Sequence, residues 1–139
     1  MTARLQTHDF DISKEIHALG SGNDKVGGIA TFVGRVRKHD GDREIIDLNL
    51  EHYPGMTEKQ LAILESEAQK QWPIDESLII HRYGRLRPGD QIVLVATAAT
   101  HRQAALEACA FLIEQLKTRA TFWKEENTSE GRRWVEPSS

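Results

Sequence analysis

Two stretches with helical periodicity, each opening on a capping-box pattern, lie between runs of strand-like sequence, and this order limits the choice of fold more than any other property of the chain. Thr57 is followed three residues later by Gln60, and Thr100 by Gln103, a pairing that satisfies free N–H groups at a helix start. Apolar residues then recur at helical spacing: Leu61, Leu64, Ala68 and Trp72 in the first stretch, and Ala105, Cys109, Leu112 and Leu116 in the second. We therefore expect two long helices, each with one face packed on a sheet.

The segments around these helices have the composition of β-strands. Residues 26–37 are rich in β-branched and aromatic side chains, and their Gly27-Gly28 pair indicates a bulge or a close approach of backbones. In residues 45–53, apolar Ile46, Leu48 and Leu50 alternate with polar neighbours, which is the period of a half-buried strand.

Residues 77–84 and 91–99 are two further strand-like runs, joined through Pro88-Gly89, and we expect them to form a hairpin. A short helix is expected to begin near Asp11 or Ser13 and to end at the glycines that follow. Helices placed between runs of neighbouring strands, without strict alternation, predict an α+β fold.

The size and charge of the chain exclude several classes of protein. At 139 residues it is long enough to bury one core but hardly two, so residues 1–139 are expected to form a single domain. A net charge of -3 argues against a protein that binds nucleic acid through a broad basic face. No stretch approaches the roughly 18 apolar residues of a membrane span. With no secretory signal pattern and one cysteine, we expect a cytoplasmic protein that contacts no membrane.

Two basic clusters are candidate anion sites. If Thr100 caps the second helix, His101 and Arg102 are its first residues, where free N–H groups and the helix dipole favour an anion. Arg35 and Arg37 alternate along the end of the predicted strand and would lie on one face of it. The alternatives are an incidental basic pair at a solvated helix start and an ordinary polar sheet face.

A third cluster joins two lysines to an apolar pair. Lys117 lies at the end of the second helix, and Lys124 follows Phe122 and Trp123. A lysine acts as a base or nucleophile only when neutral, and apolar walls or nearby cations favour the neutral form. The alternative is that Lys117 only caps the end of the helix and that the aromatic residues beside it are buried in the core.

Other residues carry no predicted chemistry. Cys109 falls on the apolar stripe of the second helix and is expected to be a buried hydrophobe, not a nucleophile or sulfur carrier. His52 and His81 lie on predicted strands and are expected to be structural. The chain has no CxxC, no HxxxH and no P-loop, so we expect neither a metal site nor a bound cofactor.

Five segments occur in order along the chain: TFVGRVRKH (31–39), LEHYPGMTEKQL (50–61), IIHRYGRLRPGD (79–90), THRQAALEACAFLIEQLKTRATFWKEE (100–126) and GRRWVE (131–136). Their combination resembles the large, catalytic subunit of molybdopterin synthases. The resemblance implies an α/β hammerhead fold with an additional antiparallel β subdomain. It also implies a transferase of molybdenum cofactor biosynthesis, a sulfurtransferase that converts cyclic pyranopterin monophosphate to the dithiolene of molybdopterin.

The same resemblance implies the partners. The sulfur arrives as a thiocarboxylate on the C-terminal Gly-Gly tail of a small ubiquitin-like subunit. Two large subunits form a central homodimer of a heterotetramer, with a small subunit at each end. A noncatalytic module that binds a phosphorylated ligand, or a scaffold for a ubiquitin-like partner, is the alternative function.

Roles for individual residues follow from the matching segments. Lys117 and Lys124 match the family's catalytic lysines, and the residues expected to bind substrate are Arg35, Arg37, His101, Arg102 and Glu126. His101 and Lys117 are 16 residues apart on one helix, or about 24 Å. Since one small pterin can hardly span that distance, we expect each active site to combine the lysines of one protomer with His101 and Arg102 of the other.

Overall fold

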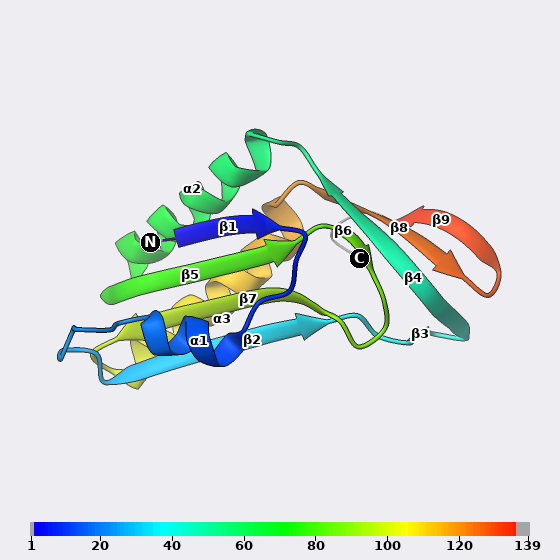
Figure 1. The fold of residues 1–139 in the computed structure, drawn as a ribbon. Coiled ribbons are helices and arrows are strands. Elements are labelled where there is room, and N and C mark those ends of the chain that lie inside the picture. Colours follow the sequence, from blue (N-terminus) through cyan, green and yellow to red (C-terminus); the bar gives the residue numbers. More distant parts are fainter. Residues whose placement is uncertain (1, 136–139) are drawn as a thin grey trace.

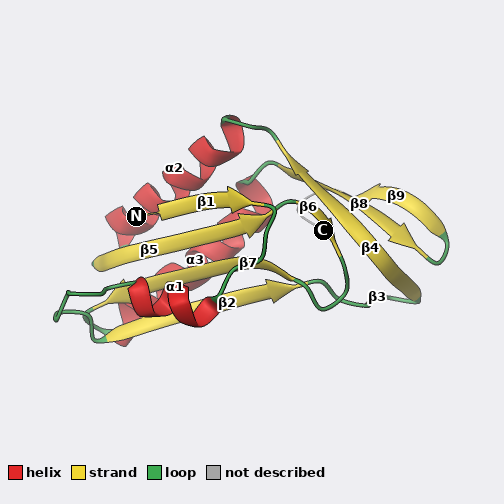
Figure 2. Ribbon diagram, viewed as in Figure 1, coloured by secondary structure: helices red, strands yellow, loops and turns green. Residues whose placement is uncertain are grey.

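The computed structural model describes residues 2–135, which form three helices and nine strands along that part of the chain (Figure 1; Figure 2). Glu136, the last residue of the segments that carry the family resemblance, lies outside the described residues. The helices are α1 (Ile12–Ala18), α2 (Met56–Gln71) and α3 (Arg102–Arg119). The strands are β1 (Thr2–Gln6), β2 (Gly28–Arg35), β3 (His39–Asp40), β4 (Arg43–His52), β5 (Ile74–Arg82), β6 (Gly84–Leu86), β7 (Gln91–Ala99), β8 (Phe122–Thr128) and β9 (Gly131–Val135).

The first sheet has the strand order β1-β5-β7-β2. Strands β5 and β7 pair antiparallel, which confirms the expected hairpin, and β2 pairs antiparallel with β7. Strand β1, which the sequence did not predict, lies parallel to β5 with Thr2 opposite Leu78 and Gln6 opposite Arg82. The alternation of β5 therefore places Ile79 and His81 on one face of this sheet and Leu78 and Ile80 on the other.

Helices cover both faces of the first sheet, as Figure 1 shows. Helices α2 and α3 pack on one face, around a core that includes Leu61, Leu64, Ile79 and Leu112. The expected apolar stripes of both helices face this core. Helix α1, whose N-cap is the expected Asp11, covers the other face through a smaller cluster, and its partners there are Leu78, Ile80, Leu94 and Ala96.

The second sheet is antiparallel and extends from one end of the first (Figure 2). Its order is β3-β4-β8-β9, with β6 paired to β4. A register shift between Ile45 and Asp47 turns Ile45 inward and leaves Ile46 53% exposed. The predicted inward position of Ile46 is therefore wrong, because a bulge reverses the alternation at that point. Together the two sheets and the helices give the α+β hammerhead with a β subdomain.

Both predicted capping boxes are wrong. Helix α2 begins two residues earlier than predicted, with Gly55 as N-cap at a φ of 88°, and Glu58 accepts the Gly55 N–H at 3.1 Å. Thr57 and Gln60 instead bind Thr121: the Thr57 hydroxyl donates to its carbonyl at 3.0 Å, and the Gln60 side-chain oxygen accepts its N–H at 3.0 Å. These contacts tie α2 to the connection between α3 and β8.

Helix α3 has His101 as its N-cap, with no side-chain cap, so Thr100 lies outside the helix. Gly27 explains the local geometry, because a Cβ at that position would lie 2.2 Å from the carbonyl oxygen of Thr100. A close approach of backbones was one of the two expectations for the Gly27-Gly28 pair, and it is confirmed. The chain just before β2 lies against the turn that leads into α3.

Candidate active site

A pocket of about 140 Å³ opens where the first sheet, the last turns of α3 and the second sheet meet. Its walls are mainly apolar, and two ammonium groups stand among them. The lining residues are Phe32, Leu50, His81, Ile92, Val93, Val95, Ile113, Leu116, Lys117, Phe122 and Lys124. Charges beside apolar walls interact more strongly than they would in bulk solvent, and this effect is greater for Lys124, which is 25% exposed, than for Lys117, which is an exposed residue.

The two lysines reach this pocket from different elements. Lys117 lies in the last turn of α3, where a cation is favoured by the helix dipole. The helix ends at buried Ala120, whose N–H bonds the Leu116 carbonyl at 3.3 Å. The chain then enters β8, and its alternation turns Phe122 and Lys124 to the same side. The structure thus brings together the two lysines that the sequence singled out.

His81 and Phe122 form an aromatic wall of the pocket. Their rings stack with centroids 3.8 Å apart and an interplanar angle of 17°. Burial lowers the pKa of His81 to about 4, so the imidazole is neutral near pH 7. Its Nδ1 lies 2.8 Å from the Arg82 carbonyl, which can only accept, so Nδ1 carries the proton. His81 was expected to be a structural residue, and sequence reasoning missed that it lines the pocket.

Glu126 lies behind Lys124 and is not part of the pocket lining. Its side chain is 1% exposed, and its Oε2 is 3.5 Å from the Lys124 Nζ. Lys124 itself is 25% exposed. A carboxylate buried this completely requires a compensating charge, and the adjacent ammonium supplies part of it.

His101 and Arg102 line a separate depression at the opposite end of α3, together with Gly27, Thr100 and Gln103. Both side chains are exposed. Free backbone N–H groups and the positive end of the helix dipole face this depression, an arrangement that suits an anion. Within one chain, the structure therefore separates this basic pair from the lysine pocket.

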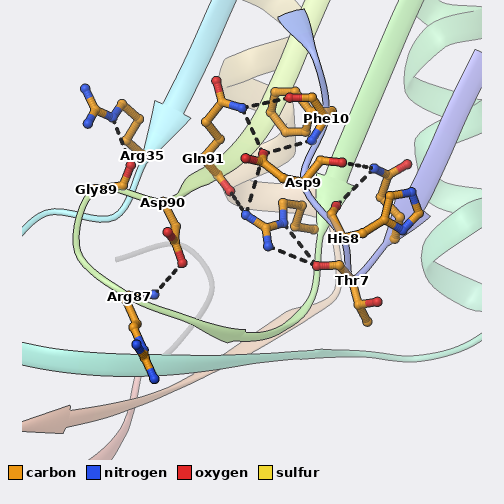
Figure 3. Close-up of polar contacts among 11 residues, drawn as sticks. Thr7, His8, Asp9, Phe10, Arg35, Arg87, Gly89, Asp90 and Gln91 are labelled. Carbon is orange, nitrogen blue, oxygen red and sulfur yellow. Dashed lines mark hydrogen bonds and ion pairs between the residues drawn. The ribbon is translucent and has the colours of Figure 1, made fainter.

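Arg35 and Arg37 line neither the lysine pocket nor this depression. Arg35 is the last residue of β2, and its Nε donates to the Gly89 carbonyl at 3.2 Å. Figure 3 shows Arg35 beside the turn that contains Gly89, where Asp90 accepts the Arg87 backbone N–H at 2.9 Å. Arg37 follows β2 and is exposed, so its guanidinium is open to solvent.

Residues 2–135 contain no group of three or more histidine, cysteine, aspartate or glutamate side chains that could hold a metal ion. None of the helices in that range is long and apolar enough to cross a membrane.

Comparison with known proteins gives a consistent result. The profile of the family described as MoaE protein matches residues 5–119. The chain is 50% identical over 136 residues to the molybdopterin synthase catalytic subunit of Pseudomonas aeruginosa, covering 98% of this chain and 91% of that protein. The structure of the molybdopterin biosynthesis MoaE protein from Burkholderia ambifaria superposes with a TM-score of 0.87 at 50% identity, covering 99% of this chain and 90% of that one.

A more distant structure has the same fold. It is a protein–protein complex of subunits 1 and 2 of the molybdopterin-converting factor from Helicobacter pylori. The TM-score is 0.79 at 21% identity, covering 96% of this chain and 89% of that one.

Proposed function

The chain belongs to the MoaE family of molybdopterin synthase catalytic subunits, and from this premise we propose that its lysine pocket transfers sulfur to cyclic pyranopterin monophosphate. The donor is the C-terminal thiocarboxylate of a small ubiquitin-like subunit, and the product is the dithiolene of molybdopterin. One observation carries this proposal: Lys117 and Lys124, from different elements, line the same apolar pocket. We place the reaction in the cytoplasm, the compartment that suits a chain whose single cysteine is free and buried.

The pocket suits a chain terminus that carries its own activated sulfur. A Gly-Gly tail has no side chains, so it can enter a narrow space between Phe32, Ile113 and Phe122. The terminal thiocarboxylate is an anion and would meet the ammonium groups of the two lysines. The chain needs no sulfur chemistry of its own, which agrees with Cys109 being buried in the core.

The lysines have different proposed roles. Lys117 serves in acid–base chemistry at the thiocarboxylate and the pterin. Lys124 stabilises the negative charge that develops when the sulfur attacks, an effect that grows in a site with little water. Glu126, behind Lys124, holds that ammonium in place and does not itself touch the pterin.

The phosphate of the pterin is the proposed ligand of Arg37, His101 and Arg102, with Arg35 nearby. Holding this group would orient the reacting carbons against the sulfur. His101 and Arg102 begin α3 and Lys117 lies in its last turn, so we propose that each site is shared between two protomers. The assembly would then be a homodimer of this chain with one small subunit at each end, and a dimer would be required for activity.

Reconstitution tests the proposed function. The protein is mixed with a thiocarboxylated small subunit and the pterin precursor, and dithiolene formation is measured. Lys117→Ala should lower turnover about 100-fold or more, since general acid–base groups contribute at least that much, and should still bind the small subunit. Lys70→Ala, which removes an exposed lysine near the end of α2, is the matched control. Near-normal turnover by Lys117→Ala would refute the assignment.

A further inference from the structure

A row of four charged side chains runs from the lysine pocket to the outer edge of the second sheet. Lys124 lies 3.5 Å from Oε2 of Glu126. The other carboxylate oxygen, Oε1, accepts a hydrogen bond from Arg133 Nε at 2.9 Å and forms an ion pair with Arg133 Nη2 at 2.8 Å. The same Nη2 lies 2.8 Å from Oδ2 of Asp40. Two positive and two negative groups therefore alternate in a row of zero net charge.

Strand register creates this row. Alternation along β8 turns Lys124 and Glu126 to the same side. Arg133 on β9 lies directly opposite Glu126 in the antiparallel ladder, so its guanidinium needs no special loop to reach the carboxylate. Asp40 on β3 approaches from the far side of β4 in strand order. The final strand is therefore connected to the pocket through a single buried carboxylate.

The two cations share Glu126 unequally. Arg133 donates a charge-assisted hydrogen bond from Nε to Oε1 and also holds Nη2 at 2.8 Å from the same oxygen as an ion pair. Lys124 stays at 3.5 Å, beyond the usual 2.7–2.9 Å or so for an ammonium bonded to a carboxylate. Glu126 is fully buried and would otherwise draw its remaining cation into direct contact, because an unpaired buried charge is strongly unfavourable. Arg133 thus leaves the Lys124 ammonium oriented but with its hydrogen-bond donors free.

We propose that Arg133 is a positioning residue for Lys124: it holds the Glu126 carboxylate so that the lysine stays at the pocket wall, available to the substrate. This inference rests on the proposed role of Lys124 in the sulfur transfer. Without the guanidinium, Lys124 would close onto Glu126 and withdraw from the pocket. The small subunit and the pterin would still bind, but the charge developing in the reaction would lose its partner.

The test compares neighbouring arginines on β9. Arg133→Met should lower kcat about 10- to 100-fold, the loss that accompanies a displacement of about 1 Å in a catalytic group. The KM for the pterin and the affinity for the small subunit should remain unchanged. Arg132→Met is the matched control, because Arg132 forms an ion pair with Glu125 at 2.9 Å and not with Glu126. An unchanged kcat in Arg133→Met would overturn the inference.

A second substitution separates positioning from mere support of the hairpin. Adding Glu126→Gln to Arg133→Met removes the charge that captures Lys124, so kcat should rise above that of Arg133→Met. It should stay below the value of the unsubstituted protein, because Lys124 then also lacks the carboxylate that holds it in place. If Arg133 only stabilised β8 and β9, the double variant would be no better than the single one, and that result would also overturn the inference. Circular dichroism and urea unfolding check that each variant is folded. Arg133→Gln, which also removes the positive charge beside Glu126 but keeps a polar side chain, replaces Arg133→Met in both comparisons if the latter does not fold.

Lys124→Ala distinguishes this inference from the proposed function beneath it. Loss of turnover in Lys124→Ala together with normal turnover in Arg133→Met would overturn only the role of Arg133. Normal turnover in Lys124→Ala would instead overturn the proposed role of the lysine and, with it, the inference drawn from it.

Discussion

The imidazole of His81 lies flat against the ring of Phe122, with 3.8 Å between their centroids. His81 comes from the end of β5 and Phe122 from the start of β8, so this stack joins the two sheets at the lysine pocket. Because burial lowers the pKa of His81 to about 4, protonation in the folded protein would place a charge between an aromatic ring and the core.

Stability should therefore fall in mild acid. The ordinary pKa of histidine is 6.5, so between about pH 6.5 and 4 the unfolded chain binds a proton that the folded chain excludes. Above that window His81 does not lower the free energy of unfolding. Below it, His81 lowers the free energy of unfolding by at most about 3 kcal/mol. Urea unfolding measured from pH 7 to 4 should show that the free energy of unfolding depends less on pH in His81→Phe than in the unsubstituted protein. His39→Gln, which changes an exposed histidine, is the control. The prediction is contradicted if the free energy of unfolding changes with pH equally in His81→Phe and in the unsubstituted protein.

Complementation should reveal a site shared between protomers. Lys117→Ala and Arg102→Ala should each be inactive alone, because each removes one half of every site. In a mixed dimer, one of the two sites regains both halves, so statistical exchange should restore about a quarter of full activity. Turnover of the mixture is the measurement, with native mass spectrometry to prove subunit exchange. Proven exchange without recovered turnover would argue for sites contained within one chain.

Gly27→Ala should disturb the start of α3. The new Cβ would lie 2.2 Å from the Thr100 carbonyl oxygen, and relief of such a clash typically costs about 1–3 kcal/mol. We expect a lower free energy of unfolding and weaker binding of the pterin phosphate near His101 and Arg102. Gly28→Ala is the matched control, because its Cβ would meet nothing closer than 3.7 Å. Equal unfolding free energies for the two variants would contradict this prediction, because they would show that the turn at Thr100 can move to accept the new Cβ without loss of stability.

Cys109 should be inert in the folded protein. Its side chain is in the core, 5% exposed, and burial raises the pKa of the thiol to about 11. Iodoacetamide at pH 8 should therefore alkylate it only after unfolding, as mass spectrometry can measure. Cys109→Ala should retain sulfur transfer, because the partner supplies the sulfur. Loss of turnover in a folded Cys109→Ala protein would implicate the thiol in the reaction.

The helices and the hairpin were predictable because their signals are local. Leu61, Leu64 and Ala68 recur with the period of a helix, and Pro88-Gly89 favours a turn whatever surrounds it. The caps of the two long helices were not predictable. Thr57 and Gln60 match a capping box, but both bind Thr121, which is more than 60 residues away in sequence. When a side chain can form a hydrogen bond with either a local or a distant partner, the sequence does not show which partner it binds.

The sequence by itself determined the α+β class, the two long helices and the two lysines that could carry chemistry, since residue type and short-range period suffice for each. Only the tertiary structure decided which groups meet. It brought Lys117 and Lys124 into one pocket, placed His81 in its wall, and set Arg133 opposite Glu126. The physical reason is that these neighbours depend on the pairing and register of strands distant in sequence, and such pairing is settled by the packing of the whole fold.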